Sequence, residues 1–249
     1  MKRSLKAEAA DDDTSGRTMA DIVYRKLRDD IVVGVLAPGT PLRSDEIRAA
    51  YGTGISPLRE ALTRLTAEQL VTSIGQRGFR VAPLSAEDVL DTMETRILVE
   101  TEALRLSIAR GGVAWEAELA AAGHALKRTP FPIGPGAESD TWAPLHWQFH
   151  FALLSACGSK WLLRLFDILF AQAERHRLHA MTLGQPAPQV RDRVGEHDAI
   201  FKATMDRNAR LATAELDRHY RLSAEHVAAV LRGSESGKDA RSVTLEIAN

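Results

Sequence analysis

The chain has little cysteine, no long apolar run and no catalytic signature motif. A single cysteine in 249 residues, Cys157, excludes an internal disulfide framework and fits a reducing compartment. No stretch approaches roughly 18 uninterrupted apolar residues, and the start MKRSLKAEAADDDTSGRT lacks the apolar core of a signal peptide. Phosphate-loop, dinucleotide, zinc-protease and serine-hydrolase strings are absent, which weakens an enzyme interpretation. We therefore expect a cytoplasmic protein without membrane contact, with a disordered tail over residues 1–16.

Charge is distributed unevenly along the chain. The formal net charge is −1, yet residues 17–84 hold 10 Lys/Arg against 7 Asp/Glu, and residues 85–249 hold 19 against 22. A length of 249 residues exceeds one typical domain and suggests two. A basic front and an acidic back are typical of a small nucleic-acid module joined to a different kind of domain.

The front part predicts two short helices joined by a tight turn. After an amphipathic helix over 19–34, the string SDEIRAAYG predicts a helix that Ser44 caps and Gly52 ends. GTGI forms the turn, and SPLREALTRLTAEQL predicts a second helix with Ser56 as N-cap and Pro57 at its first helical position. The expected buried stripe of this helix is Leu58, Ala61, Leu62, Leu65 and Leu70.

A hairpin is predicted directly after these helices. Two β-rich runs, 70–74 and 79–81, flank the turn sequence GQRG. Helix, helix, turn, helix and hairpin together make a winged helix-turn-helix over residues 17–84. Such a module suits double-stranded DNA, because the second helix of the pair fits the major groove and the wing reaches the flanking backbone.

The strings SPLREAL, GQRGF and RVAPLS resemble the DNA-binding domain of the GntR family of bacterial transcription regulators. The resemblance implies that Ser56, Pro57 and Leu58 open the recognition helix and that Arg59 reaches a base edge or a phosphate. The other DNA contacts expected are Arg43 and Ser44, Arg64, and the wing tip of Gln76, Arg77 and Gly78. Arg43 and Arg64 have an alternative interpretation as solvated surface charges.

One position departs from the family pattern. Many members carry an arginine in the turn before the recognition helix, and this chain has Ile55 there. An isoleucine cannot make the bidentate contact to guanine that an arginine makes, a difference of about 1 to 3 kcal/mol in discrimination. We therefore expect an operator that differs from those of the better-known fatty-acid-type regulators.

The back part is wholly helical in pattern. A helix over 85–110 begins at a cap-like Ser85, and further helices are expected at 115–126, 140–157, 160–181, 189–205 and 209–231. Their connections are short, as in an antiparallel bundle. The fold class is thus mainly α, with a helical effector-binding and dimerisation domain over 85–232 and a polar, mobile tail over 233–249.

Histidines are the informative residues of this bundle. His146 and His150 lie four positions apart, which puts them on one helix face, although such a pair arises easily by chance. His197 and His219 fall on two other predicted helices. Two histidines from one helix and one from each of two others can converge in a bundle core, which is how such bundles build metal sites.

The same residues resemble the FCD effector domain of the FadR branch of GntR regulators. Its marks are the segment RILVE, the pair Phe149-His150, the pair Glu196-His197, and His219. The resemblance implies that His150, His197 and His219 hold a divalent metal, while His146 stands where an aspartate is normal. Strings such as GISPLREAL and CGSKWLL also resemble a narrower subgroup, the carbon-starvation-induced repressors linked to glutarate and related short dicarboxylates.

Replacing aspartate by His146 changes the charge of the expected site. Four neutral imidazoles leave a divalent site at +2, where three imidazoles and a carboxylate leave +1. This set favours zinc or nickel, with copper also suited. His146 has alternative roles as a support for the ligands, an effector contact or a satisfied core histidine.

Arg96 is the expected carboxylate clamp, because the family places an arginine on the first effector helix facing the bundle cavity. Its alternative is an intrahelical pair with Glu100, worth about 0.2 to 0.5 kcal/mol on an exposed helix. Arg175 and Arg177 are further candidates for the same pocket.

These expectations describe a dimeric, metabolite-responsive transcription regulator. Two winged domains would grip the half-sites of a palindromic operator, and a small carboxylate bound at the metal would release a repressor from it. Two alternatives stay open at this point. One is a helical-bundle metalloenzyme, and the other is a constitutive DNA-binding protein whose metal is structural.

Overall fold

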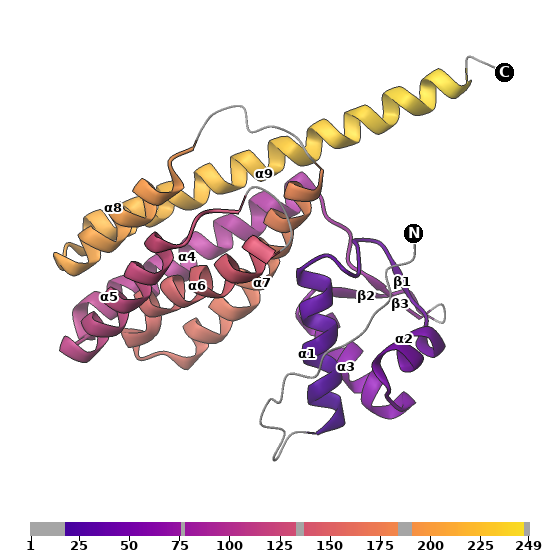
Figure 1. Cartoon of the computed structure of the whole chain (residues 1–249), viewed down its shortest axis with the longest axis horizontal. Coiled ribbons are helices and arrows are strands. Elements are labelled where there is room, and N and C mark those ends of the chain that lie inside the picture. The colour runs from indigo at the N-terminus through magenta and orange to yellow at the C-terminus, as the bar shows by residue number, and fades with distance from the viewer. Residues whose placement is uncertain (1–17, 76–77, 133–136, 184–190, 247–249) are drawn as a thin grey trace. The chain divides into compact units, whose positions relative to one another are not determined.

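The chain forms two compact units: the described residues up to Asp29 together with Pro41–Arg80 make up the first, and Asp30–Thr40 together with the described residues from Val81 on make up the second (Figure 1). This computed structural model describes residues 18–75, 78–132, 137–183 and 191–246. The fold is mainly helical with one small sheet, as predicted. Within the described ranges, no helix combines the length and apolarity needed to cross a bilayer.

The first unit is the predicted winged helix-turn-helix. In chain order its elements are α1 Met19–Val32, β1 Pro41–Leu42, α2 Ser44–Tyr51, α3 Ile55–Ala67, β2 Val71–Ser73 and β3 Phe79–Val81. The sheet order is β1-β3-β2, and β1 pairs antiparallel with β3, with Leu42 opposite Phe79. The short strand β1 was not predicted. Two residues between a glycine turn and a helix carry no periodicity, and only pairing with β3 defines them as a strand.

The core of the first unit is the apolar stripe of α3 packed with that of α1. Leu58, Leu62 and Leu65 of α3 are at most 1% exposed, as are Leu27 and Ile31 of α1. Full burial of a leucine or isoleucine contributes about 1.5 to 3 kcal/mol. The helical spacing in the sequence therefore identified this core correctly.

α2 starts one residue, and α3 two residues, before the predicted position. α2 already includes Ser44, with Arg43 at the N-cap position, and α3 begins at Ile55 after Gly54. At neither N-cap does a side chain accept a hydrogen bond from a backbone amide of the helix. Gly54 has the extended backbone of a cap, which glycine accepts at little cost, so Ser56 falls in the first turn instead of capping it.

The second unit is an all-helical bundle. Its elements are α4 Ala86–Arg110, α5 Val113–Arg128, α6 Ala137–Leu154, the 3₁₀ turn η2 Ser155–Cys157, α7 Lys160–Thr182, α8 Arg193–Met205 and α9 Ala209–Glu246. α4 packs along α9 and α7, α8 packs on α9, and α5 packs on α6 and α8 (Figure 1). Ser85 caps α4, since its Oγ accepts a hydrogen bond from the Asp88 amide at 3.0 Å, as predicted.

Two helices run past their predicted ends. α6 begins at Ala137, three residues before the expected start, and contains Pro144 inside the helix. α9 continues beyond residue 232 to Glu246, where a non-helical tail was expected. This stretch contains no proline, and its two glycines, Gly233 and Gly237, each cost only about 1 kcal/mol within a helix, so nothing in it stops the helix.

Candidate metal centre and adjoining pocket

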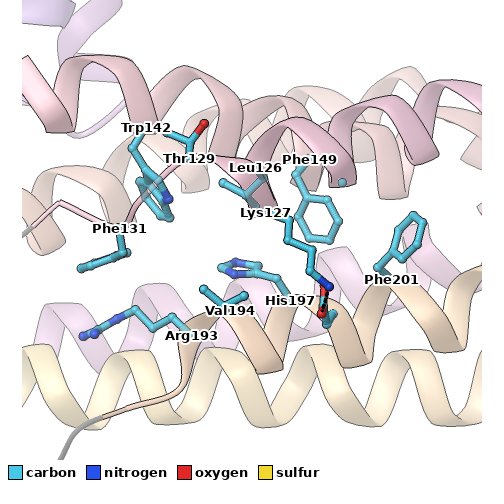
Figure 2. A pocket seen from close by; sticks show the side chains of 12 residues that line it. Leu126, Lys127, Thr129, Phe131, Trp142, Phe149, Arg193, Val194, His197 and Phe201 are labelled. Carbon is cyan, nitrogen blue, oxygen red and sulfur yellow. Dashed lines mark hydrogen bonds and ion pairs between the residues drawn. The ribbon is translucent and has the colours of Figure 1, made fainter.

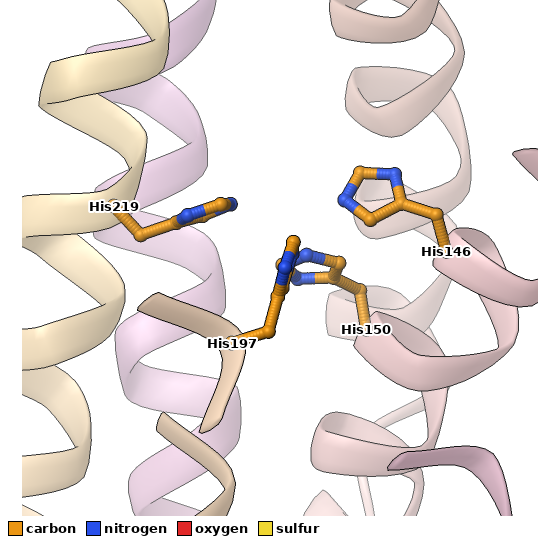
Figure 3. A group of neighbouring side chains, drawn as sticks. All are labelled: His146, His150, His197 and His219. Atoms are coloured by element: carbon orange, nitrogen blue, oxygen red, sulfur yellow. The ribbon is translucent and has the colours of Figure 1, made fainter. Parts of the chain in front are cut away.

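Four histidines from three helices converge in the core of the bundle. His146 and His150 come from α6, His197 from α8 and His219 from α9 (Figure 3). Each offers one ring nitrogen such that the four atoms lie within 4.8 Å of one another, and all four side chains are buried. The structure thus brings together all four of the predicted ligands.

Helix geometry explains the α6 pair. Residues four apart lie one turn above each other, and the rings of His146 and His150 are 4.6 Å apart between centroids. The other two histidines arrive through packing. The His197 ring lies 5.4 Å from that of His150 and 4.6 Å from that of His219.

Hydrogen bonds fix the tautomer of His150. Tyr220 donates its single hydroxyl proton to Oε2 of Glu100 and accepts a hydrogen bond from Arg96 Nη2 at 3.0 Å. His150 Nδ1 lies 3.0 Å from the same hydroxyl, so this nitrogen must carry the proton and donate it. Nε2 of His150 is then a bare lone pair, and it is buried without a partner.

His219 and His197 are oriented in the same way. His219 Nδ1 lies 2.7 Å from Oε2 of Glu196 and 3.2 Å from Nη2 of Arg191, and the shorter contact, to a carboxylate that can only accept, places the proton on Nδ1. Arg191 forms an ion pair with that carboxylate and donates to the His219 carbonyl oxygen at 2.9 Å. His197 donates to the carbonyl of Arg193, while its Nε2 is buried without a partner. Carboxylate and carbonyl acceptors of this kind are the usual outer support of metal-bound histidine.

His146 lacks such a support. Its Nδ1 is buried without a hydrogen-bond partner, and its ring stacks on Trp142 at a centroid distance of 4.2 Å. A buried polar atom left unpaired costs about 1 to 3 kcal/mol. His146, His150 and His197 each carry one such nitrogen.

Burial keeps the four imidazoles neutral. It is the main cause that lowers the pKa of His146, His150 and His219 well below the usual range, and repulsion from neighbouring histidines adds to it. The pKa of His197 falls to about 4, again mainly through burial. Neutral imidazole is the form that binds a metal ion, so no proton must leave at pH 7.

Arg96 is occupied by the protein itself. Its Nε donates to Oε1 of Glu100 at 2.6 Å, and the guanidinium lies 4.2 Å from the centre of the Tyr220 ring. The pair is buried, with Glu100 fully so. The intrahelical pair, our alternative interpretation, is therefore present. Arg96 lines the cavity, but its guanidinium donates a hydrogen bond to the Tyr220 hydroxyl. That hydroxyl in turn contacts His150.

A pocket of about 600 Å³, open space at its mouth included, adjoins the histidines. His146, His197 and His219 form part of its wall, together with apolar side chains such as Phe170 and Val227. Its cationic lining consists of Arg96, Arg177, Arg191 and Arg193. Arg175 is not part of this lining. It donates to the backbone carbonyl of Ala82 instead, which corrects its expected place in the pocket.

Only one arginine of the lining lacks a carboxylate partner among the described residues. Arg177 pairs with Glu174 and Arg191 with Glu196, whereas Arg193 lies over the Phe131 ring at 4.4 Å. Burial, followed by repulsion from Arg191, lowers the pKa of Arg193 from its usual value. A cation in this position attracts an anion into the pocket.

A second recess lies on the other side of His197. Phe131, Trp142, Arg193 and His197 line both cavities, and Phe149 and Phe201 belong to this recess alone. Figure 2 shows Arg193, Phe131 and Trp142 to one side of His197 and Phe201 to the other. The neighbourhood of the histidines thus combines aromatic side chains with arginines and with other polar groups such as Glu174 and Ser223.

The predicted DNA-contacting arginines differ in their freedom. Arg59 is exposed on α3 and forms no ion pair in the part of the chain that is described. Arg64 is tied to α1, because its Nη1 lies 2.6 Å from Asp21 Oδ1 and its guanidinium stacks on Tyr24 at 3.9 Å. Arg64 therefore joins α3 to α1, which neither of our interpretations foresaw. Arg43 is exposed and forms a surface pair with Glu46 at 3.2 Å.

The other predicted DNA-contacting residues lie at the helix starts and the wing. Ser44 is half-buried in the first turn of α2. Ser56 is exposed and Pro57 half-buried in the first turn of α3. Gly78 has a φ of 92°, which a turn reserves for glycine, while Gln76 and Arg77 lie outside the described residues.

Comparison with known families agrees with both units. Residues 19–81 match the family described as bacterial regulatory proteins, gntR family, and residues 91–222 match the FCD domain. The chain belongs to the GntR family. This GntR regulator is 35% identical to the HTH-type transcriptional repressor GlaR of Escherichia coli (strain K12), over 79% of this chain and 90% of that one.

Other relatives agree with this assignment. The HTH-type transcriptional regulator BphR of Paraburkholderia xenovorans (strain LB400) is 35% identical, over 82% of each chain. The solved structure of E. coli McbR/YncC shares the fold with a TM-score of 0.70 at 17% identity, over 85% of this chain and 97% of that one. GlaR and BphR are named as transcription regulators, so the enzyme alternative loses its support.

Sequence reasoning missed the residues that orient the histidines. Tyr220, Glu196 and Arg191 were not predicted to have roles, and neither was Arg193. Glu196 and Tyr220 each adjoin a predicted histidine in the sequence, which was the available signal. Arg193 gave none, because an arginine in the first turn of a helix is common on any protein surface.

Proposed function

We propose that this GntR regulator is a metabolite-responsive repressor. Its FCD domain would hold a divalent metal at His146, His150, His197 and His219. A small carboxylate that binds at this metal would cause the repressor to dissociate from its operator. The observation that carries the proposal is the convergence of four buried, neutral imidazoles, three of which have a buried ring nitrogen without a hydrogen-bond partner. Zinc or nickel is the expected metal, since imidazole suits such ions.

The effector would be an anion with two charged ends. Four neutral imidazoles leave the metal site at +2, and the nearby carboxylates of Glu174 and Glu196 are each paired with an arginine, so the site attracts one carboxylate. Arg193, unpaired among the described residues and lining the same pocket, is available for the second one. A short dicarboxylate matches this arrangement, with one end at the metal and the other at the guanidinium.

The winged unit would read the operator as half of a homodimer. Two copies related by a twofold axis require a palindromic site, with α3 of each in the major groove. Arg59 at the exposed start of α3 would contact a base edge or a phosphate, and Ser56 and Pro57 would lie against the backbone. Arg43, Ser44 and the wing around Gly78 would add backbone contacts. The regulator would act in the cytoplasm, on the chromosome.

Effector binding must distinguish two arrangements of the dimer. A ligand shifts an equilibrium only by the difference in its affinity for the two states. The remaining alternative is a constitutive DNA-binding protein with a structural metal. The pocket beside the histidines favours the responsive form, because a purely structural site has no need of an adjoining cavity with an unpaired cation.

An operator-binding titration tests the proposal. Full-length protein, loaded with zinc or stripped by a chelator, would be titrated on its operator against mono- and dicarboxylates of equal length. We expect release by a dicarboxylate, loss of this response on chelation, and recovery on adding zinc. An operator affinity that no acid changes would support the constitutive alternative. Release that still occurs after chelation would show that the metal has no part in the response.

Two variants refine the test. Arg193→Gln should weaken the dicarboxylate response about tenfold or more and leave a monocarboxylate response unchanged, because only the second charged end loses its partner. Arg164→Gln, an exposed arginine on α7 outside the pocket, is the matched control. His146→Asp should retain zinc and bind the acid more weakly, because the site loses one positive charge. An unchanged acid affinity in His146→Asp would contradict the charge argument.

A further inference from the structure

Ile55 is an exposed apolar residue at the start of an otherwise regularly patterned helix. It is the first residue of α3 and is 55% exposed, whereas the inward residues Leu58, Leu62 and Leu65 are at most 1% exposed. Leaving a side chain of this size in water forgoes about 1.5 to 3 kcal/mol of burial. More than half of its surface stays open to solvent, where a group from outside the unit can reach it.

The exposed face of α3 shows where Ile55 points. Ile55, Arg59 and Thr63 follow one another at intervals of four residues, and all three are exposed. Residues at this spacing lie on one helix face. The hydroxyl of Thr63 is used internally, because it donates to the Arg59 carbonyl at 2.8 Å. The face therefore presents one cation and, one turn earlier, one apolar group.

We propose that Ile55 selects thymine at one position of each operator half-site, by packing against the C5 methyl group in the major groove. This inference rests on the proposed placement of α3 in that groove. The N-terminal residues of a recognition helix contact base edges. Of the four base pairs, only those with thymine present an apolar group in the major groove, so an isoleucine there has one favourable partner.

The chemistry of the neighbours supports this choice. Gly54 precedes Ile55 in extended conformation and Ser56 follows it, so no long side chain stands between Ile55 and a base edge. Ile55 has no polar atom in its side chain and cannot compensate a desolvated guanine or adenine edge. Cytosine offers an amino donor that would lose its water against the isoleucine. Thymine is the base that gains from the contact.

Replacing thymine by deoxyuridine is a direct test, because it removes only the methyl group. The operator would first be selected by full-length protein from random double-stranded DNA, and each thymine would then be replaced in turn. We expect one thymine in each half-site at which the replacement weakens wild-type binding about fourfold, the value of one buried methyl group.

The variants decide whether Ile55 is the partner of that methyl group. Ile55→Ala should bind the thymine operator more weakly and show no further loss with deoxyuridine at that position. Ile55→Val should keep most of the sensitivity, and Ile55→Arg should shift the selected base toward guanine. Arg59→Ala is the matched control, since it should retain the deoxyuridine effect. It should also reduce the slope of log binding constant against log salt concentration by about 1.

The outcomes separate this inference from the proposed function. Equal deoxyuridine losses in wild type and Ile55→Ala, or no sensitive thymine at all, would overturn the role of Ile55 while leaving the operator-binding function intact. Failure to enrich any sequence would overturn both. Because Ile55 is exposed, its variants should unfold at the wild-type temperature, which a thermal melt verifies.

Discussion

The Tyr220 hydroxyl, which orients His150, can be tested by removing that one oxygen atom. Tyr220→Phe removes the hydroxyl that accepts hydrogen bonds from His150 Nδ1 and Arg96 Nη2, both at 3.0 Å, and that donates to Glu100. The rest of the ring keeps its packing. The buried pair of Arg96 and Glu100 also survives, since it has a hydrogen bond of its own at 2.6 Å.

The expected loss is in metal affinity. Without its acceptor, the imidazole of His150 can flip or change tautomer, and a weaker ligand then faces the metal. Loss of such an outer partner typically costs 10 to 100-fold in affinity, or about 1.4 to 2.7 kcal/mol. Unfolding of the metal-free protein should become easier by about 1 to 3 kcal/mol, because buried polar groups lose a partner.

Competition between the stripped protein and a chromophoric chelator for zinc measures this affinity. Tyr24→Phe is the control, because the Tyr24 hydroxyl also donates to a carboxylate, that of Glu68, but in the DNA-binding unit. It should leave the zinc affinity unchanged. A zinc affinity for Tyr220→Phe within twofold of wild type would refute the assignment of the His150 tautomer.

Two further predictions concern the scaffold of the effector domain. Gly111→Ala should destabilise the protein by about 1 to 3 kcal/mol in a denaturant titration, because the added Cβ would lie 2.1 Å from the Trp115 ring. Gly233→Ala on α9, with open space around its Cα, should be neutral or stabilising. The hydrogen bond from His176 holds the pKa of the Asp88 carboxyl below its usual 3.8. A depressed folded-state pKa gives stability that is present above the unfolded pKa and lost as the pH falls through the folded one. Asp88→Asn should therefore flatten the acid limb of the stability profile below about pH 4; an unchanged limb would contradict this.

Helical periodicity accounts for much of what was predictable. The apolar stripe of α3, the capping of α4 by Ser85 and the shared face of His146 and His150 depend on residues within one or two turns. Such local patterns determine the element types almost completely. The strand β1 and the length of α9 were not predictable in this way. The strand β1 depends on its partner strand β3, and the length of α9 depends on the absence of a residue that stops the helix.

Tertiary structure decided which side chains are free to act. Arg96 and Arg64 looked like available cations in the sequence, and both are held by carboxylates, one 4 positions away and one 43 positions away. Arg193 had no distinguishing pattern, and it is the arginine of the pocket that has no carboxylate partner among the described residues.

The sequence by itself determined the two units, the DNA-binding architecture and four histidines on three helices. Only the packing of α6, α8 and α9 decided that their ring nitrogens meet within 4.8 Å and that Tyr220 and Glu196 orient them. The reason is the range of the forces. Backbone hydrogen bonding and turn chemistry act over a few residues, whereas a buried histidine or carboxylate is defined by whichever distant side chain satisfies it.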